Sequence, residues 1–311
     1  MNIAIDIMGG DFAPQSTLSG AIEARKELPK EVILTLIGDE KQIKPALEEA
    51  GMADKFGIIH TDEVIGMGEH PTKALMQKPK SSIGIGFHLL TTGKVDAFAS
   101  AGNSGAMFVG AVYSVKPIPG ISRPPIATLV PKESGGYGLM LDVGANADCK
   151  PELLQEFALL GSVYAKAILE IENPKVGLMN IGEEAEKGNL ASQTAHKLLS
   201  QQEKINFIGN IEGRDLFNAK ADVIVTDGFT GNIILKSAES FYSYLRKYNF
   251  TNDFFDRFNY ENYGGSPILG VNAPVIIGHG ISNSTAIKNM ILQAYQIKSS
   301  NLTEKIKKIF S

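Results

Sequence analysis

The sequence of 311 residues has little cysteine: Cys149 is the only one. A single cysteine cannot form an intrachain disulfide, so we expect a reducing compartment such as the cytoplasm. The first residues carry no basic segment, and Asp6 interrupts their apolar run, so no signal peptide is expected. Runs of about 20 apolar residues, which a membrane-spanning helix needs, are also missing. These absences predict a soluble protein or, at most, one peripheral to a membrane.

Basic residues are not in surplus either. Lys and Arg number 30 against 34 Asp and Glu, which gives a formal net charge of −4. A nucleic-acid-binding protein usually has a basic face, so we expect no nucleic acid as a partner. The overall charge leaves room for a local basic patch that could meet an acidic protein.

Familiar cofactor and metal motifs are missing from the sequence. The glycine pairs at residues 66–68, 84–86 and 278–280 all lack the third glycine of a G-x-G-x-x-G motif. The only Gly-Lys pair, Gly93-Lys94, is followed by Val95, which excludes a Walker loop. The five histidines show no metal-ligand spacing. We therefore expect no cofactor and no bound metal.

Apolar strand-like runs alternate with helical patterns along most of the chain. Strands are expected at residues 2–7, 31–37, 58–59, 95–99, 126–130, 138–142, 175–180, 206–208, 222–225 and 273–277. Helices are expected at residues 14–28, 39–50, 81–92, 104–115, 151–170, 190–200, 232–247 and after Ser282. This alternation predicts an α/β fold with a mostly parallel sheet and helices on both faces. We expect one large domain over residues 1–311, with an irregular aromatic insertion at about 248–263.

Two turns combine a strand end, small polar residues and a following helix. The first covers residues 100–105 and includes Asn103 and Ser104; the second covers residues 227–232. Backbone N–H groups and the helix dipole gather at such places, which suits an anion such as phosphate. One such turn is weak support, because any α/β connection needs a glycine and a capping residue. Two of them favour an enzyme that handles phosphate.

Further polar residues follow other predicted strands. The interpretation as ligand-binding residues covers Asp6 and Gly10, Asp142 and Asn146, Asn180 and Lys187, and His279 and Ser282. Carboxyl ends of parallel strands are where open α/β sheets bind ligands. The alternative is structural: Asp142 could be a hydrogen-bonded buried aspartate, and the acidic residues near Lys187 a solvated helix start. A histidine between two glycines, as at His279, favours function over core packing.

Taken together, these turns resemble the acyl-carrier-protein-dependent phosphate acyltransferase family of bacterial phospholipid synthesis. The resemblance spans roughly residues 1–298 and rests on six motifs in order, at residues 6–14, 100–106, 141–146, 180–188, 225–236 and 263–282. It implies a fold similar to the phosphate acetyltransferases and the isocitrate-dehydrogenase-like superfamily, and a homodimer. It also implies that a long-chain acyl group passes from acyl-carrier protein to inorganic phosphate, giving acyl phosphate for phosphatidic acid synthesis.

Roles follow from this reaction as hypotheses. Phosphate is a competent nucleophile, so the enzyme must position it, stabilise an oxyanion and assist the leaving thiol. We assign phosphate binding to Asn103-Ser104 and to Thr230-Gly231-Asn232, with Lys187 or Lys236 as countercharge. His279 is the candidate for proton donation or oxyanion contact, and Asn232 is a second oxyanion candidate. Asp227 and Asp142 would orient His279 or the phosphate.

Other functions share this fold. A CoA-dependent short-chain phosphate acyltransferase is one alternative, but those enzymes carry Arg after the serine and Asp further on, where this chain has Asn283 and Asn289. A metal-dependent decarboxylating dehydrogenase would need clustered aspartates, and the one pair three residues apart, Asp253 and Asp256, lies in the irregular segment. A non-catalytic scaffold is the remaining alternative.

Residues 248–263 are rich in aromatic side chains among polar ones. Phe254, Phe255 and Phe258 could share one face of a helical turn. They would either bury against a dimer partner or touch the inner face of the cell membrane, where a membrane acyl-phosphate:glycerol-3-phosphate acyltransferase would accept the product. For docking of the acidic carrier protein, basic candidates are Arg246, Lys247, Lys305, Lys307 and Lys308.

Overall fold

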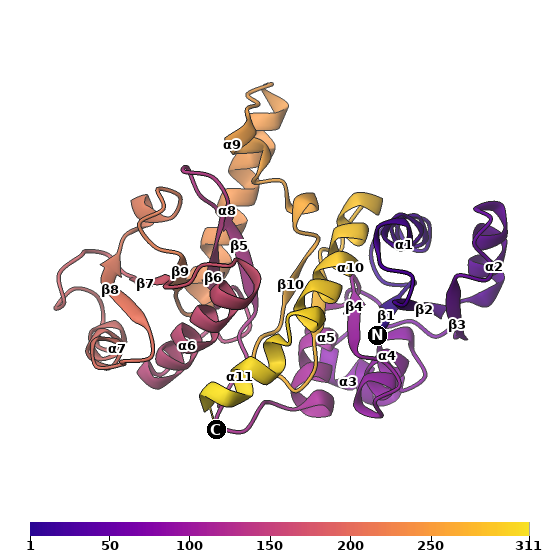
Figure 1. Ribbon diagram of the computed structural model, residues 1–311, viewed down its shortest axis with the longest axis horizontal. Coiled ribbons are helices and arrows are strands. Elements are labelled where there is room, and N and C mark those ends of the chain that lie inside the picture. The colour runs from indigo at the N-terminus through magenta and orange to yellow at the C-terminus, as the bar shows by residue number, and fades with distance from the viewer. Residues whose placement is uncertain (311) are drawn as a thin grey trace. The chain divides into compact units, whose positions relative to one another are not determined.

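The structure is a computed structural model that describes residues 1–310 (Figure 1). Its contacts divide the chain into two compact units. Unit 1 comprises Met1–Pro117 and Tyr260–Ser299, and unit 2 comprises Ile118–Asn259 and the segment from Ser300 onward. The expectation of one large α/β domain did not anticipate this division.

Unit 1 is built on a six-stranded sheet in the order β10-β11-β4-β1-β2-β3. Its strands are β1 (Asn2–Asp6), β2 (Ile33–Gly38), β3 (Phe56–His60), β4 (Ala97–Ser100), β10 (Gly265–Pro267) and β11 (Val275–Gly278). All neighbours pair in parallel except β10, which runs antiparallel to β11. The central strands are almost entirely buried and mostly apolar, as expected for a parallel sheet covered on both faces.

Helices cover both faces of this sheet. They are α1 (Gln15–Glu27), α2 (Glu40–Glu49), α3 (Pro71–Gln77), α4 (Ser82–Thr91), α5 (Ser104–Gly110), the π-helical turn η1 (Ala111–Val115), the short η3 (Tyr260–Asn262) and α10 (Ser284–Ser299). Figure 1 shows α1 and α4 on opposite sides of β1 and β2. Helix α1 packs against α10, although the two lie far apart in the sequence.

Unit 2 has a five-stranded sheet in the order β5-β6-β9-β7-β8. The strands are β5 (Ala127–Pro131), β6 (Tyr137–Leu141), β7 (Lys175–Met179), β8 (Asn206–Ile211) and β9 (Val223–Val225). Only the β5–β6 hairpin is antiparallel. The helices are α6 (Pro151–Ile168), α7 (Leu190–Ser200), η2 (Gly213–Asp215), α8 (Gly228–Lys247), α9 (Asp253–Asp256) and α11 (Leu302–Phe310). Each unit therefore confirms the predicted fold class, a mostly parallel sheet flanked by helices.

Some elements differ from the sequence-based expectation. The helix expected at residues 232–247 begins at Gly228, because the Asp227 side chain accepts a hydrogen bond from the Thr230 N–H at 2.7 Å and caps it. The short elements α3, α9, α11 and β10 were not expected. Within residues 1–310 no helix has the length and apolar character to span a membrane.

Candidate active site

In unit 1, three neighbouring strands end at one edge of the sheet. Strands β1, β4 and β11 are parallel and adjacent, and they end at Asp6, Ser100 and Gly278. The chain leaves β1 towards β2 on one side, whereas β4 lies on the other side of β1. Open α/β sheets bind ligands outside the strand ends at such a reversal of strand order. This edge of the sheet is therefore a candidate ligand-binding site.

Asp6 holds two turns together at this edge. Its carboxylate accepts hydrogen bonds from the Met8 N–H at 3.0 Å and the Ser100 hydroxyl at 2.7 Å, and it is only 1% exposed. The Ser100 hydroxyl oxygen in turn accepts one from the Gly102 N–H at 2.9 Å. Burial raises the pKa of Asp6 above 3.8, while these hydrogen bonds oppose the rise. Asp6 thus lies beneath the turns and positions them.

Glycines let these turns approach one another. A Cβ atom on Gly9 would lie 2.5 Å from Asp6 Oδ2 and 2.6 Å from the Gly102 nitrogen, so a side chain has no room there. Gly10 has a φ of +108°. The next residue, Asp11, donates its N–H to the Gly280 carbonyl at 2.7 Å. The turn after β1 is therefore joined to the turn after β11.

Asn103 and Ser104 have different surroundings. The Asn103 amide oxygen accepts from the Ala106 N–H at 2.9 Å and caps α5. Its amide nitrogen lies within 3.0–3.2 Å of three carbonyl oxygens of the loop at residues 66–69. Asn103 is buried and used within the protein, whereas Ser104 is exposed. Of this predicted phosphate-binding pair, Ser104 alone faces solvent.

His279 and Ser282 lie on the turn after β11. The His279 ring is half-buried and contacts the Tyr260 ring, with 4.9 Å between centroids. The Tyr260 hydroxyl donates to the Ile281 carbonyl at 3.0 Å, and the Ser282 N–H donates to the His279 carbonyl at 3.0 Å. Among residues 1–310, nothing hydrogen-bonds the Ser282 hydroxyl oxygen, although Ser282 is only 3% exposed. The structure therefore brings Asp6, Gly10, His279 and Ser282 to one edge of unit 1.

In unit 2, Asp142 is the centre of a hydrogen-bonded turn after β6. Its carboxylate accepts bonds of 2.6–3.2 Å from the backbone N–H groups of Ile126, Gly144, Ala145 and Asn146. The Asn146 side-chain amide adds a bond at 2.9 Å. Burial raises the pKa of Asp142 above 3.8, and the N–H donors oppose the rise. Both predicted residues, Asp142 and Asn146, are buried and shape the turn.

The start of α8 packs directly on this turn. The Gly228 N–H donates to the Asn146 carbonyl at 2.8 Å, and the Asn232 amide donates to the Val143 carbonyl at 3.1 Å. Asp227 accepts from the Thr230 N–H at 2.7 Å and from the Thr230 hydroxyl at 2.9 Å. The predicted site residues Asp227, Thr230, Gly231 and Asn232 therefore form the first turn of a helix, with several of their donors already bonded within the protein.

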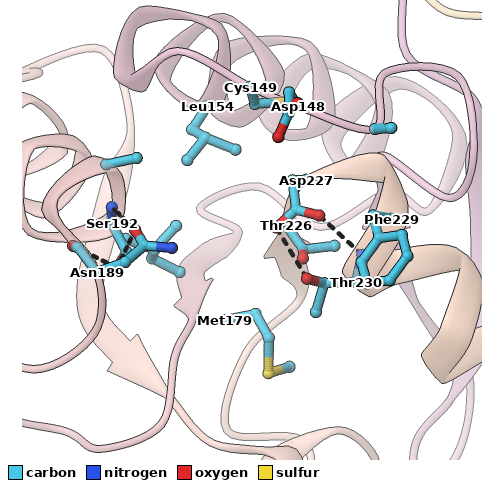
Figure 2. A pocket seen from close by; sticks show the side chains of 13 residues that line it. Asp148, Cys149, Leu154, Met179, Asn189, Ser192, Thr226, Asp227, Phe229 and Thr230 are labelled. Carbon is cyan, nitrogen blue, oxygen red and sulfur yellow. Dashed lines mark hydrogen bonds between the residues drawn. The ribbon is translucent and has the colours of Figure 1, made fainter.

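A pocket opens beside Asp227, at the carboxyl ends of β7 and β9. Its volume is about 470 Å³, within the range of about 300–1,000 Å³ typical of small-molecule sites. It is lined by Ala147, Asp148, Cys149, Leu154, Leu178, Met179, Asn189, Ala191, Ser192, Thr226, Asp227, Phe229 and Thr230. Figure 2 shows Asn189 and Ser192 on one side, Phe229 and Thr230 on the other, and Met179 below. We call this cavity the unit 2 pocket.

Cys149 is one of the lining residues that the sequence did not suggest. Burial raises the pKa of its thiol to about 12, with the Asp142 and Asp227 charges adding to the effect. Its sulfur lies 3.5 Å from the Asn146 carbonyl oxygen, to which the thiol donates. A cysteine in this state is a neutral thiol at physiological pH rather than a nucleophile.

The remaining predicted residues of unit 2 lie on the loop after β7, which carries Asn180 and Lys187, and on helix α8, which carries Lys236. The Asn180 side chain donates to the Lys187 carbonyl at 3.1 Å and accepts from the Ile181 N–H at 2.9 Å, so it shapes the loop at residues 180–188. Lys187 is exposed. Lys236 forms an ion pair with Glu239 at 2.8 Å. None of these three lines the unit 2 pocket.

One carboxylate cluster in the described residues has the spacing of a metal site: Glu183, Glu212 and Asp215. Cations of the protein already neutralise it. Lys220 pairs with Glu183 at 2.6 Å and with Asp215 at 3.1 Å, and Arg214 pairs with Glu212. Against the effect of burial, hydrogen bonds from the Glu212 N–H, the Asn218 amide and Lys220 lower the pKa of Asp215. The hydrogen bond to Glu183 raises the pKa of Lys220. We interpret the cluster as an ion-pair network.

The sequence gives only a weak signal for the pocket-lining residues Asp148, Cys149 and Asn189, which were not predicted. Asn189 caps α7 by accepting from the Ser192 N–H at 2.9 Å, an ordinary capping pattern. Asp148 and Cys149 follow the predicted motif at 141–146 but match no catalytic spacing. The pocket is lined by the segments that follow β6, β7 and β9. They come together only because these three strands lie next to one another in the sheet.

Comparison with known proteins shows which family the sequence matches. The sequence model of the family described as "Fatty acid synthesis protein" matches residues 1–249 and 245–305. A phosphate acyltransferase of Halothermothrix orenii is 42% identical, over 99% of this chain and 98% of that protein. One of Dictyoglomus turgidum is also 42% identical, over 98% and 96%.

Solved structures share the fold at lower identity. A phosphotransacetylase from Streptococcus pyogenes has a TM-score of 0.64 and 20% identity, covering 96% of this chain and 94% of that one. A branched-chain phosphotransacylase from Enterococcus faecalis V583 has a TM-score of 0.63 and 13% identity, covering 96% and 99%. At these identities the likeness concerns the fold alone.

Fold and relatives together define an enzyme of the acyltransferase class. Within that class, the chain belongs to the family of bacterial phosphate acyltransferases. The resemblance to bacterial phosphate acyltransferases is thereby confirmed, and the acyl-carrier-protein donor stays a prediction.

Proposed function

We propose that the protein transfers a long-chain fatty acyl group from acyl-carrier protein to inorganic phosphate. Membership of the phosphate acyltransferase family, together with the match to a fatty acid synthesis family, is the observation that carries the proposal. A phosphate oxygen attacks the thioester carbonyl, the carbon–sulfur bond breaks, and the proton of hydrogenphosphate passes to the departing thiolate. The products are acyl phosphate and the free thiol of the carrier.

The state of Cys149 supports direct attack by phosphate. The chain has no other cysteine, and burial keeps this thiol protonated, with a pKa of about 12. A covalent acyl–cysteine intermediate would need a thiolate. We assign the oxyanion or proton-donating role to His279, and phosphate contacts to Ser104 and Ser282, all of which belong to unit 1.

The decisive assay offers long-chain acyl-carrier protein and the matched acyl-CoA side by side, each with inorganic phosphate. Acyl phosphate and free thiol are measured together, with phosphate omitted as the control. Release of both products from the carrier-bound donor supports the proposal. Turnover of short-chain acyl-CoA alone would instead make the protein a CoA-dependent phosphate acyltransferase, and absence of turnover with every donor would favour a scaffold.

The cellular setting is part of the proposal. The enzyme acts as a homodimer in the cytoplasm, peripheral to the inner face of the cell membrane, and passes acyl phosphate to a membrane acyl-phosphate:glycerol-3-phosphate acyltransferase. Exposed aromatic residues support a surface contact of this kind: Tyr248 is 64% exposed and Phe250 is 65% exposed. Arg246 and Lys247, both exposed, are candidates for docking of the acidic carrier.

A further inference from the structure

The lining of the unit 2 pocket mixes polar and apolar side chains. Six of its residues carry oxygen or nitrogen in their side chains, six are apolar, and the last is Cys149. Asn189 and Ser192 face Asp227 and Thr230 across the pocket, while Leu154 and Met179 lie above and below (Figure 2). A fatty chain needs a continuous apolar wall, because each buried polar group without a partner costs free energy. This wall fits a slender ligand in which amide and methylene groups alternate.

An anion is a poor fit for the same pocket. Asp148 and Asp227 both line it, and no Lys, Arg or His does. Helix N-termini attract anions through free N–H groups, but here the caps are occupied: Asn189 accepts from the Ser192 N–H at 2.9 Å, and Asp227 accepts from the Thr230 N–H at 2.7 Å. Carboxylates and amide oxygens instead accept hydrogen bonds from neutral N–H and O–H groups.

We propose that the unit 2 pocket binds the pantetheine arm of the acyl donor, an inference that rests on the proposed function. This arm carries two amides, one hydroxyl-bearing segment and two methylene segments before its sulfur. It therefore offers N–H and O–H donors to the Asp148 and Asp227 carboxylates and methylenes to Leu154 and Met179. Acyl-carrier protein and CoA share the arm, so the pocket recognises the chemistry common to both donors. The protonated thiol of Cys149 neither repels nor attacks the thioester.

Binding can be tested without any turnover. The methyl carbon of Met179 lines the pocket and gives an NMR signal when methionine methyls are labelled with ¹³C; a Met179→Leu variant assigns it among the nine methionines. Titration of the full chain with S-methyl pantetheine should shift the Met179 signal saturably. Met76, which is 78% exposed and outside the pocket, serves as the control signal and should not move. Inorganic phosphate alone is the matched ligand control.

A pocket-filling variant connects binding to catalysis. Ala191 lines the pocket from α7, so Ala191→Trp places an indole in the cavity. Lys197→Trp puts the same ring on the exposed face of that helix and is the matched control. We expect Ala191→Trp to raise KM at least tenfold for both acyl-carrier protein and acyl-CoA donors, with KM for phosphate changed less than twofold. Lys197→Trp should leave all three unchanged.

The outcomes separate this inference from the proposed function. If no acyl donor turns over, the function fails, and the Met179 titration still decides whether the arm binds. An unmoved Met179 signal at millimolar S-methyl pantetheine overturns the inference, even if phosphorolysis is active. So does an equal shift with phosphate alone, which would make this an anion site. A larger fold-increase in KM for phosphate than for the donor in Ala191→Trp, relative to wild type, would overturn it as well.

Discussion

Asp6 and Asp142 each end a central strand with a carboxylate that solvent barely reaches. Both are predicted to contact ligand, and in the structure both accept hydrogen bonds from the turns that follow β1 and β6. A buried carboxylate surrounded by N–H and O–H donors fixes backbone that glycine would otherwise leave flexible. At the residue scale, then, the sequence predicted which turns carry buried polar residues. Which of these residues position the backbone, and which are exposed, follows only from the hydrogen bonds and burial in the structure.

The pH dependence of the free energy of unfolding should reveal the raised pKa of Asp6. Its folded-state pKa is raised by burial, so the unfolded chain loses this proton at a lower pH than the folded chain. The stability that the group contributes is therefore complete below about pH 3.8 and is lost as the pH rises through the raised value. Asp6→Asn does not titrate, so the free energy of unfolding of wild type minus that of the variant should decrease between pH 4 and pH 8. Urea titrations across this range measure it; a difference that is flat or rises with pH contradicts the assignment.

The Cys149 thiol should react slowly in the folded protein. A pKa of about 12 leaves roughly one thiol in ten thousand ionised at pH 8, about a thousandfold less than for a free cysteine. Labelling with a chromogenic disulfide reagent should be slower by about that factor than in urea, where the thiol is exposed. Equally fast labelling of folded and unfolded protein would show that the thiol is neither buried nor protonated as described.

His279 is the residue on which the proposed chemistry depends most. Loss of an oxyanion contact typically lowers turnover about 10²–10³-fold, so His279→Ala should fall in that range in the phosphorolysis assay. His88→Ala, at an exposed position on α4, is the matched control and should keep the wild-type rate. A near-wild-type rate for His279→Ala would remove this residue from the mechanism.

At the scale of elements, close packing decides where α8 begins. The sequence pattern predicted its start at Asn232, after a polar turn at residues 227–232. The structure uses Gly228 and Gly231 because the helix lies against the turn after β6: a Cβ atom on Gly231 would lie 1.9 Å from the Asp142 carbonyl oxygen. Local rules could not supply this reason, which depends on a strand more than 80 residues earlier in the chain.

Gly231→Ala tests this packing. Alanine favours a helix over glycine by about 1 kcal/mol, but overpacking typically costs about 1–3 kcal/mol, and here the contact is with backbone that cannot move aside cheaply. We expect a net loss in the free energy of unfolding, measured by urea denaturation. Gly213→Ala in η2 is the control, because nothing lies within 4 Å of its Cβ position, and should change stability by less than about 0.5 kcal/mol. Equal effects at the two glycines would contradict the close approach.

At the scale of the whole molecule, the alternating pattern predicted the fold class but not its two sheets. Strand β11 pairs with β4, and α10 packs on α1, across a very long stretch of chain. Periodicity within a short window carries no information about such pairings. The chain first passes from unit 1 to unit 2 after Pro117, at the start of a Pro-rich connection that is visible in the sequence. The later crossings, after Asn259 and Ser299, have no comparable signal.

The aromatic insertion now divides into two groups of rings. Phe254 contacts Phe258 with 5.3 Å between centroids, and Phe258 contacts Phe217 at 4.8 Å, so these rings support one another within unit 2. Tyr248 and Phe250 are instead about two-thirds exposed. The proposed membrane contact should therefore depend on the second group, and removal of the first should disturb the fold of the insertion.

Liposome flotation with anionic vesicles tests this division. Full burial of an aromatic ring is worth about 1.5–3 kcal/mol, so two partly inserted rings give weak, reversible binding. The double variant Tyr248→Ser/Phe250→Ser should lose at least about tenfold in membrane-bound fraction while sedimentation shows an unchanged oligomer. The triple variant Phe254→Ala/Phe255→Ala/Phe258→Ala should lower thermal stability as well. If the double variant floats like wild type but sediments as a smaller species, these rings bury against a second copy of the chain, and the membrane contact is wrong.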